Sequence, residues 1–181
     1  LRALDDLVRQ GKARYIGCSN FAGWQVADAA WTSRHEGITR FVSAQNEYSA
    51  LVRDAERELL PALEAHGIGL LPYYPLASGL LTGKYRRDQP LPEGSRLATT
   101  ASWAERFLTD RNWDKVEALQ RFCAERGRSM TELAFAWLAS RGVVSSIIAG
   151  ATKPEQIDAN VAAAQWKLDA AERAEIDRIT A

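Results

Sequence analysis

Polar and aromatic residues directly follow four apolar runs of the chain, and these are the positions whose chemistry matters most. They are Ser19-Asn20, Gln45-Asn46, Tyr73-Tyr74 and Gly150-Ala151-Thr152. Ser, Asn and Gln side chains can bind a carboxamide with both donors and acceptors, and an aromatic face can stack on a flat ring. A Gly that precedes a helix leaves backbone N–H groups free at the positive end of the helix dipole, which suits a phosphate. The set predicts hydrogen bonding and stacking rather than acid–base or nucleophilic chemistry.

The elements that would position these residues alternate between strand and helix patterns. Strands are expected at residues 13–18, 41–45, 68–74 and 143–149. Helices are expected at residues 1–10, 23–36, 54–66, 102–126, 130–141 and 169–180. This alternation predicts repeated βα units and a parallel sheet, in which the carboxyl ends of the strands carry the site.

Turn and cap residues mark the boundaries of these elements. A Pro- and Gly-rich stretch over residues 75–100 predicts a long loop, and such loops are usually functional or disordered. Ser129 and Glu132 have the spacing of a capping box, as do Thr152 and Glu155, with Pro154 inside the first turn of the helix that follows. The helices after these two caps therefore have defined starts.

The fold class expected from this order is α/β, of the (β/α)8 TIM-barrel type. A complete barrel runs to about 250 residues, and this chain has 181, with a helix before its first strand. Helical spacing also begins at Leu1, which is not an initiator Met. We expect residues 1–181 to be the second half of one barrel domain, strands 5 to 8 with their helices, without an internal boundary.

Composition narrows the function classes. The chain is 46% hydrophobic and 25% charged, and 23 basic residues balance 23 acidic ones, which argues against disorder and against nucleic acid as a partner. The sequence contains no apolar run long enough for a membrane span. Cys18 and Cys123 form no disulfide framework, and His35 and His66 have no metal-ligand spacing. These features predict a cytoplasmic protein without a metal site.

Taken together, the strand-end residues resemble a known family. The segments that carry the resemblance are Gly17-Cys18-Ser19-Asn20-Phe21, Gln45-Asn46-Glu47-Tyr48, residues 73–85 (YYPLASGLLTGKY) and residues 150–156 (GATKPEQ). They resemble the carboxyl-terminal half of an aldo-keto reductase over nearly the whole chain. The similarity is greatest to the branch that includes potassium channel β-subunits and bacterial oxidoreductases.

The resemblance implies a site for NADP(H), position by position. Ser19, Asn20 and Gln45 would hold the nicotinamide carboxamide, and Tyr73 would stack on the nicotinamide ring. The following loop would wrap the pyrophosphate through Pro75, Leu76, Ser78, Gly79 and Lys84, with Arg96 as a further phosphate contact. Positions around the adenosine and its 2′-phosphate would be Gly150, Thr152, Gln156 and Asn160.

This sequence departs from the family's pattern at two positions, and the family's catalytic residues lie outside the matching segments. Tyr74 stands where many members have Ser, and Ala159 where many have Glu. The family's catalytic Tyr, Lys, Asp and His belong to earlier strands of the barrel, so no catalytic residue is assigned here. Tyr15, Tyr48 and Tyr85 lack a matching Lys–Asp pair and are expected to pack or cap.

Three functions remain open on these grounds. The first is an NADP(H)-dependent oxidoreductase that reduces aldehydes or ketones, and the second is a non-catalytic nucleotide-binding module or regulatory subunit. The third is an unrelated barrel that binds a phosphorylated sugar. In each case the partner is a small molecule, and the edges of a half barrel predict association.

Several of these residues also have a purely structural interpretation. Strand-end Ser, Asn and Gly are often local caps or turns, and Lys84 can belong to a solvated loop. Cys18 is expected to be a small buried residue. Four tryptophans are expected to pack helices on strands, namely Trp24, Trp31, Trp137 and Trp166. Trp103 and Trp113 lie in the irregular region and are candidates for a substrate or partner surface.

Overall fold

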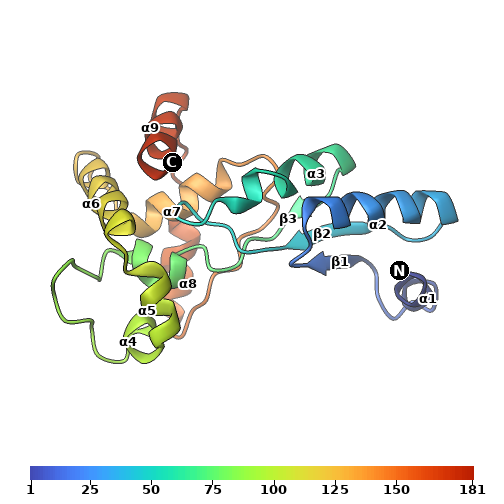
Figure 1. Cartoon of the computed structure of the whole chain (residues 1–181), viewed down its shortest axis with the longest axis horizontal. Helices are drawn as coiled ribbons and strands as arrows, with labels where there is room; N and C mark the ends of the chain where they lie inside the picture. The colour runs from blue at the N-terminus through green and yellow to red at the C-terminus, as the bar shows by residue number, and fades with distance from the viewer.

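Parallel strands and the helices between them account for the first part of the chain. The computed structural model describes all residues from 1 to 181. The helices are α1 (Arg2–Arg9), α2 (Gly23–Glu36), α3 (Leu59–His66), α4 (Arg96–Thr99), α5 (Ala101–Phe107), α6 (Asp110–Ala124), α7 (Met130–Ala139), α8 (Pro154–Ala163) and α9 (Ala170–Thr180). The strands are β1 (Ile16–Ser19), β2 (Phe41–Gln45) and β3 (Gly69–Leu70), and two 3₁₀ segments are η1 (Asp54–Glu56) and η2 (Ala77–Thr82). Figure 1 shows the sheet with α1 to α3 at one end of the molecule and α4 to α9 at the other.

The three strands form a parallel sheet in the order β1-β2-β3, so the prediction of parallel βα units is confirmed. The fourth expected strand, 143–149, is wrong as a strand. Its backbone does run beside β3, because Leu70 N–H donates to Val143 O at 2.7 Å and Ser145 N–H donates to Leu70 O at 2.9 Å. Only one bridge forms, between Leu70 and Val144, and no further strand pairs on its outer side.

The third strand is shorter than the predicted range 68–74. It ends at Leu70, two residues before Pro72, whose nitrogen has no hydrogen to donate to a ladder. Pairing resumes farther on as a single parallel bridge between Glu47 and Tyr73. The interruption leaves Tyr73 beside the continuation of β2 and outside the regular sheet.

Helices cover one face of the sheet only. Apolar side chains on that face are buried, including Ile16, Ala44 and Leu70, and α2 and α3 pack side by side over them. Along β1 the residues alternate between buried and exposed, so Gly17 and Ser19 lie on the opposite, uncovered face. The sheet therefore has an apolar covered face and a polar open one.

Several expected helices have different limits. The predicted helix 54–66 is a 3₁₀ turn followed by α3 from Leu59, since the ring of Pro61 clashes with an earlier carbonyl in a continuous helix. The predicted helix 102–126 is divided into α5 and α6, and Thr109 caps α6 by accepting from Asn112 N–H. The loop 75–100 contains η2 and α4. The helices expected at 1–10, 23–36, 130–141 and 169–180 are confirmed within one or two residues.

One of the two predicted capping boxes is present as expected. Ser129 accepts from Glu132 N–H, and Glu132 accepts from Ser129 N–H at 2.8 Å. The box at Thr152 and Glu155 is wrong, because α8 begins at Pro154 and it is Gln156 that accepts from Thr152 N–H, at 2.6 Å. The side-chain acceptor therefore lies one residue later than predicted.

Tryptophans on α2 contradict the packing prediction. Trp24 and Trp31 are 64% and 62% exposed, whereas Trp137 is fully buried and Trp166, in the segment after α8, is 9% exposed and stacks on Phe122. The outer face of α2 is not covered by any other element.

None of the helices combines the length and apolar character that a membrane crossing needs.

An ion-pair network ties η1 to α7 and α9. Arg53 pairs with Glu56 at 2.7 Å and with Asp177 at 3.2 Å. Asp177 also accepts from the indole N–H of Trp137 at 2.9 Å and pairs with Arg141. The network holds the last helix on the core, at a distance from the ends of the strands in sequence and in Figure 1.

We predict that Gly17→Ala destabilises the fold by about 1–3 kcal/mol, as overpacked sites do. A Cβ at Gly17 would lie 2.5 Å from Ser43 Oγ and 2.8 Å from the carbonyl oxygen of Ser43. Because the carbonyl is backbone, adding Ser43→Gly would not restore stability. Urea unfolding measures the difference, with Gly142→Ala as control since no atom lies within 4 Å of a Cβ there. A neutral Gly17→Ala would show that the strands separate easily at this point.

Candidate functional site

The turn after β1 rests on the end of β2. Asn20 N–H and the Ser19 hydroxyl both donate to the carbonyl oxygen of Gln45, each at 3.0 Å. Asn20 takes a left-handed backbone conformation, φ 57°, which Asn tolerates better than most residues. Ser19, Asn20 and Gln45 are all exposed at this edge, and the structure brings these three predicted residues together.

Tyr73 joins them from the third strand segment. Its backbone N–H donates to Asn46 O at 3.1 Å, and its carbonyl accepts from Tyr48 N–H at 3.5 Å. Its hydroxyl donates to Asn20 Oδ1 at 2.8 Å. The aromatic residue predicted to stack on a flat ring is therefore in direct contact with a residue predicted to bind a carboxamide.

An aromatic cluster extends this edge toward α4 and α5. The ring centroids of Tyr73 and Tyr74 are 5.0 Å apart, and those of Tyr74 and Trp103 are 4.7 Å apart, both edge to face. The guanidinium of Arg96 lies 5.5 Å from the centre of the Tyr74 ring, within cation–π range. The structure thus places Arg96 at the same edge of the sheet as Tyr73. Its position in the sequence does not predict this proximity.

A left-handed turn follows the aromatic pair. Ala77, Ser78 and Gly79 have successive positive φ values of 46°, 57° and 94°. Ser78 is buried and its hydroxyl has no hydrogen-bond partner. A Cβ at Gly79 would lie 3.3 Å from Lys84 Cε and 3.5 Å from Lys84 Nζ, so the lysine head group sits over the turn.

The remaining residues predicted in this loop belong to the same turn. The carbonyl oxygen of Leu76 accepts from Gly79 N–H at 2.9 Å and from Leu81 N–H at 3.1 Å, and Pro75 before it is buried. The N–H groups of Ala77 and Gly79 already donate to the carbonyl oxygens of Tyr74 and Leu76, so the Lys84 ammonium is the donor that this turn offers to an anion. The loop therefore has the charge for a phosphate group.

Charge at the edge comes from Glu47 and Arg106. One carboxylate oxygen of Glu47 accepts from Arg106 Nη2 at 2.9 Å, and the other is buried without a hydrogen-bond partner. Partial burial and the nearby Glu47 carboxylate raise the pKa of Tyr73 above its ordinary value. Tyr73 therefore remains a hydrogen-bond donor at neutral pH.

The other buried tyrosines have structural partners. Tyr48 donates its hydroxyl to Glu56 at 2.7 Å, and burial followed by this hydrogen bond raises its pKa. Tyr85 is 1% exposed, and its hydroxyl accepts from Leu97 N–H at 3.4 Å. Neither faces a Lys–Asp pair, which confirms that these two tyrosines pack, as predicted.

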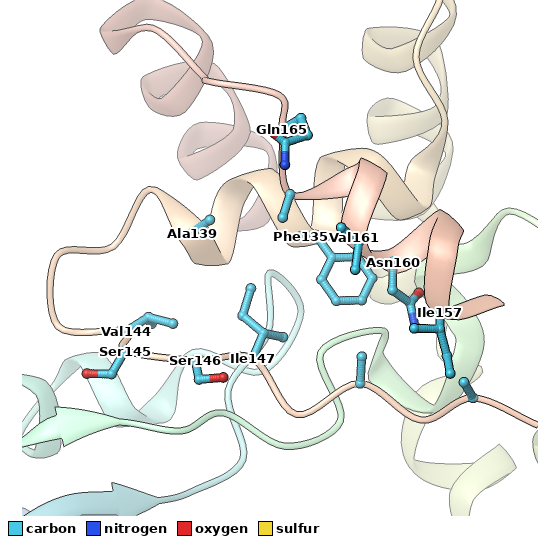
Figure 2. A pocket seen from close by; sticks show the side chains of 13 residues that line it. Phe135, Ala139, Val144, Ser145, Ser146, Ile147, Ile157, Asn160, Val161 and Gln165 are labelled. Atoms are coloured by element: carbon cyan, nitrogen blue, oxygen red, sulfur yellow. The ribbon is translucent and has the colours of Figure 1, made fainter. Parts of the chain in front are cut away.

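Residues around α8 form a separate group. Gln156 caps Thr152, Gly150 is exposed, and no hydrogen bond, ion pair or aromatic contact links them to Tyr73 or Asn20. Asn160 lines a mostly apolar cavity of about 490 Å³ between α7, α8 and residues 144–151. Figure 2 shows Ile157 and Val161 of α8 on the same cavity as Phe135 of α7. A role for Gly150, Thr152, Gln156 and Asn160 around an adenosine stays a prediction.

Sequence reasoning left out two residues that the structure places at this edge. Glu47 stands inside a quoted motif but received no role, and Arg106 gave no signal because its partner lies 59 positions earlier. Trp103, a candidate for a substrate or partner surface by sequence, contacts Tyr74 and lies beside the site.

Comparison with known proteins gives one family over the whole chain. A model of the Aldo/keto reductase family matches residues 1–181. A Schizosaccharomyces pombe protein named as a voltage-gated potassium channel subunit beta is 36% identical over 171 residues, covering 92% of this chain and 49% of the relative. An uncharacterized oxidoreductase of Bacillus subtilis is 34% identical, with 92% and 49% covered. Aflatoxin B1 aldehyde reductase member 2 of Rattus norvegicus is 33% identical, with 91% and 49% covered.

These matches confirm the resemblance and its branch. They also show that the chain spans about half the length of the curated relatives it matches. The names of those relatives describe whole proteins, and this chain corresponds to only about half of each.

We predict that the pKa of Tyr73 shifts in opposite directions when its two charged neighbours are removed. Glu47→Gln should lower it, because a negative charge near the hydroxyl disfavours the phenolate, and Arg106→Ala should raise it. The ring ¹³C chemical shift of Tyr73, followed against pH, measures both. Glu105→Gln on α5 is the control, since its exposed carboxylate is not among the charges that shift Tyr73. An unchanged pKa in Glu47→Gln would contradict the electrostatic account of this edge.

Proposed function

Because this chain belongs to the aldo/keto reductase family, we propose that it supplies the nicotinamide-nucleotide side of an NADP(H)-dependent enzyme that reduces aldehydes or ketones to alcohols. The observation that carries the proposal is the convergence of Ser19, Asn20, Gln45 and Tyr73 at one sheet edge, joined by hydrogen bonds through Gln45 O and Asn20 Oδ1. Amide and hydroxyl groups beside an aromatic face match a nicotinamide ring with its carboxamide.

The phosphate end of the cofactor has its own support. Lys84 over the left-handed turn at Gly79 would hold the pyrophosphate, and Arg96, the cation beside Tyr74, would contact the 2′-phosphate. The group on α8 would reach the adenosine and the 2′-phosphate. The bound cofactor would supply the hydride, and the residues of this chain would bind and orient it.

NADP(H) is preferred in this proposal over NAD(H). A site for NAD usually places an acidic residue on the free ribose 2′-hydroxyl, and such a residue would repel a 2′-phosphate. Gln156 and Ala159 occupy the corresponding positions on α8 and carry no charge. Neither position therefore has a carboxylate that would repel a 2′-phosphate.

A carbonyl substrate is supported by the names of two relatives. One is the aldehyde reductase of Rattus norvegicus, and the other is an L-glyceraldehyde 3-phosphate reductase of Escherichia coli O157:H7, 32% identical with 89% of this chain covered. We propose a small-molecule carbonyl compound of this class, in the cytoplasm, where the free Cys18 and Cys123 stay reduced.

The open sheet face supports the barrel architecture. Helices cover only one side of the strands, and small or polar residues such as Gly17 and Ser43 line the other. We propose that the remaining strands of a (β/α)8 barrel complete this face and bring the general acid. Without them, the uncovered face and the unpaired outer edge of residues 143–149 favour association.

A regulatory, non-catalytic role is the second candidate. The relatives named as potassium channel subunits favour it. Nucleotide binding is common to both candidates, so turnover separates them.

We predict that Arg96→Ala weakens NADPH binding about ten- to a hundredfold while barely changing NADH binding. A charged hydrogen bond contributes roughly 1.5–3 kcal/mol, and only NADPH has the 2′-phosphate. Titration of both cofactors by fluorescence against the full-length protein, with its complete barrel, is the measurement, and Arg173→Ala on the exposed face of α9 is the control. Equal losses would place Arg96 on the shared pyrophosphate, and no loss would remove it from the site.

We also predict that residues 1–181 alone do not reduce 4-nitrobenzaldehyde with NADPH above background. Hydride transfer to a carbonyl needs a proton donor, and the hydroxyls of Tyr48, Tyr73 and Tyr85 bond to Glu56, Asn20 and Leu97 rather than to a Lys–Asp pair. Loss of absorbance at 340 nm follows the reaction, against a heat-denatured sample. Steady turnover would mean that this chain holds its own general acid.

A further inference from the structure

The hydroxyl of Tyr73 makes a contact that ring stacking does not need. It donates to Asn20 Oδ1 at 2.8 Å, and the Asn20 side chain forms no other hydrogen bond. An Asn amide has one acceptor oxygen and a nitrogen with two donors. With one lone pair of the oxygen taken by Tyr73 and both Nδ2 hydrogens without a partner, Asn20 presents Nδ2 as a donor to anything that enters the site.

The Ser19 hydroxyl has the opposite restriction, because it can accept a hydrogen bond from a ligand but cannot donate one. Its hydroxyl has one proton, and that proton is donated to the carbonyl oxygen of Gln45 at 3.0 Å. The lone pairs of Ser19 Oγ stay available, so toward a ligand Ser19 accepts. The two neighbouring side chains thus present one donor and one acceptor, the pattern that is complementary to a carboxamide.

Both partners of the Tyr73–Asn20 contact are held by their backbones. Asn20 is fixed in its left-handed turn by Gln45 O, and Tyr73 lies between Asn46 O and Tyr48 N–H. The Tyr73 ring is further supported edge to face by Tyr74 at 5.0 Å. The hydroxyl and the amide therefore meet in one geometry rather than by chance rotation of two free side chains.

We propose that Tyr73 is a positioning residue whose hydroxyl fixes the Asn20 amide, so that Asn20 donates to the carboxamide oxygen and Ser19 accepts from the carboxamide nitrogen. The inference rests on the proposed nicotinamide site and adds a function to the hydroxyl beyond that of the ring. It assigns the direction of each hydrogen bond and hence which way round the carboxamide binds.

The test is a double-mutant cycle on cofactor binding by the full-length protein that contains residues 1–181. Three probes are titrated: NADPH, its 3-acetylpyridine analogue, which keeps the carbonyl oxygen and lacks the NH₂, and 2′-phospho-ADP-ribose, which lacks the ring. Tyr73→Phe should weaken NADPH and the acetylpyridine analogue about two- to tenfold, as expected for one hydrogen bond, and leave 2′-phospho-ADP-ribose unchanged. In an Asn20→Ala background, Tyr73→Phe should cause no further loss.

Controls separate the other outcomes. Tyr15→Phe removes a hydroxyl from a residue that is 75% exposed before β1, and it should change nothing. Equal loss for all three probes would show a general structural effect, and a full loss in the Asn20→Ala background would show direct contact with the ligand. Either result overturns the inference, as does unchanged NADPH binding in Tyr73→Phe. If the unaltered chain binds none of the three probes, the proposed function fails, and the inference fails with it.

Discussion

The carbonyl oxygen of Gln45 is the acceptor on which the site depends. It receives Asn20 N–H and the Ser19 hydroxyl, each at 3.0 Å, at the point where β2 ends and β1 turns away from the sheet. The backbone hydrogen bond holds Asn20 in the left-handed conformation, and in this conformation its amide faces Tyr73. Were Asn20 to relax, its amide would lose the hydrogen bond from the Tyr73 hydroxyl.

Strained backbone gathers in the segment that follows. Tyr74, Ala77 and Ser78 all have positive φ values without being Gly, which costs free energy at each position. The cost is offset by what the turns bring together: the packing of Tyr74 on Trp103, the cation of Arg96 over that ring, and Lys84 over Gly79. Strain of this kind clusters where a ligand is held, and this segment contains the loop proposed for the pyrophosphate.

The two ends of the molecule are stabilised by different interactions. Around the sheet, burial of apolar side chains under α2 and α3 dominates, and the opposite face is left polar and open. Around α7 and α9, the ion pairs of Arg53 and Arg141 with Asp177 and the indole N–H of Trp137 add to a fully buried core. An alteration of the open face is therefore expected to act on the site and on association more than on the helical end.

Most of the order of the elements, and the set of residues proposed for the strand-end site, follow from local sequence patterns. Periodicity and Gly stops gave α2, β2 and α9 closely, because such signals depend on neighbours along the chain. Motif positions gave Ser19, Asn20, Gln45 and Tyr73 as one set. The end of β3, the exposure of Trp24 and the pairing of Arg106 with Glu47 depend instead on how distant segments pack together. Pairing between strands, burial and contacts across 59 positions depend on residues far apart in the sequence, and no local pattern records them.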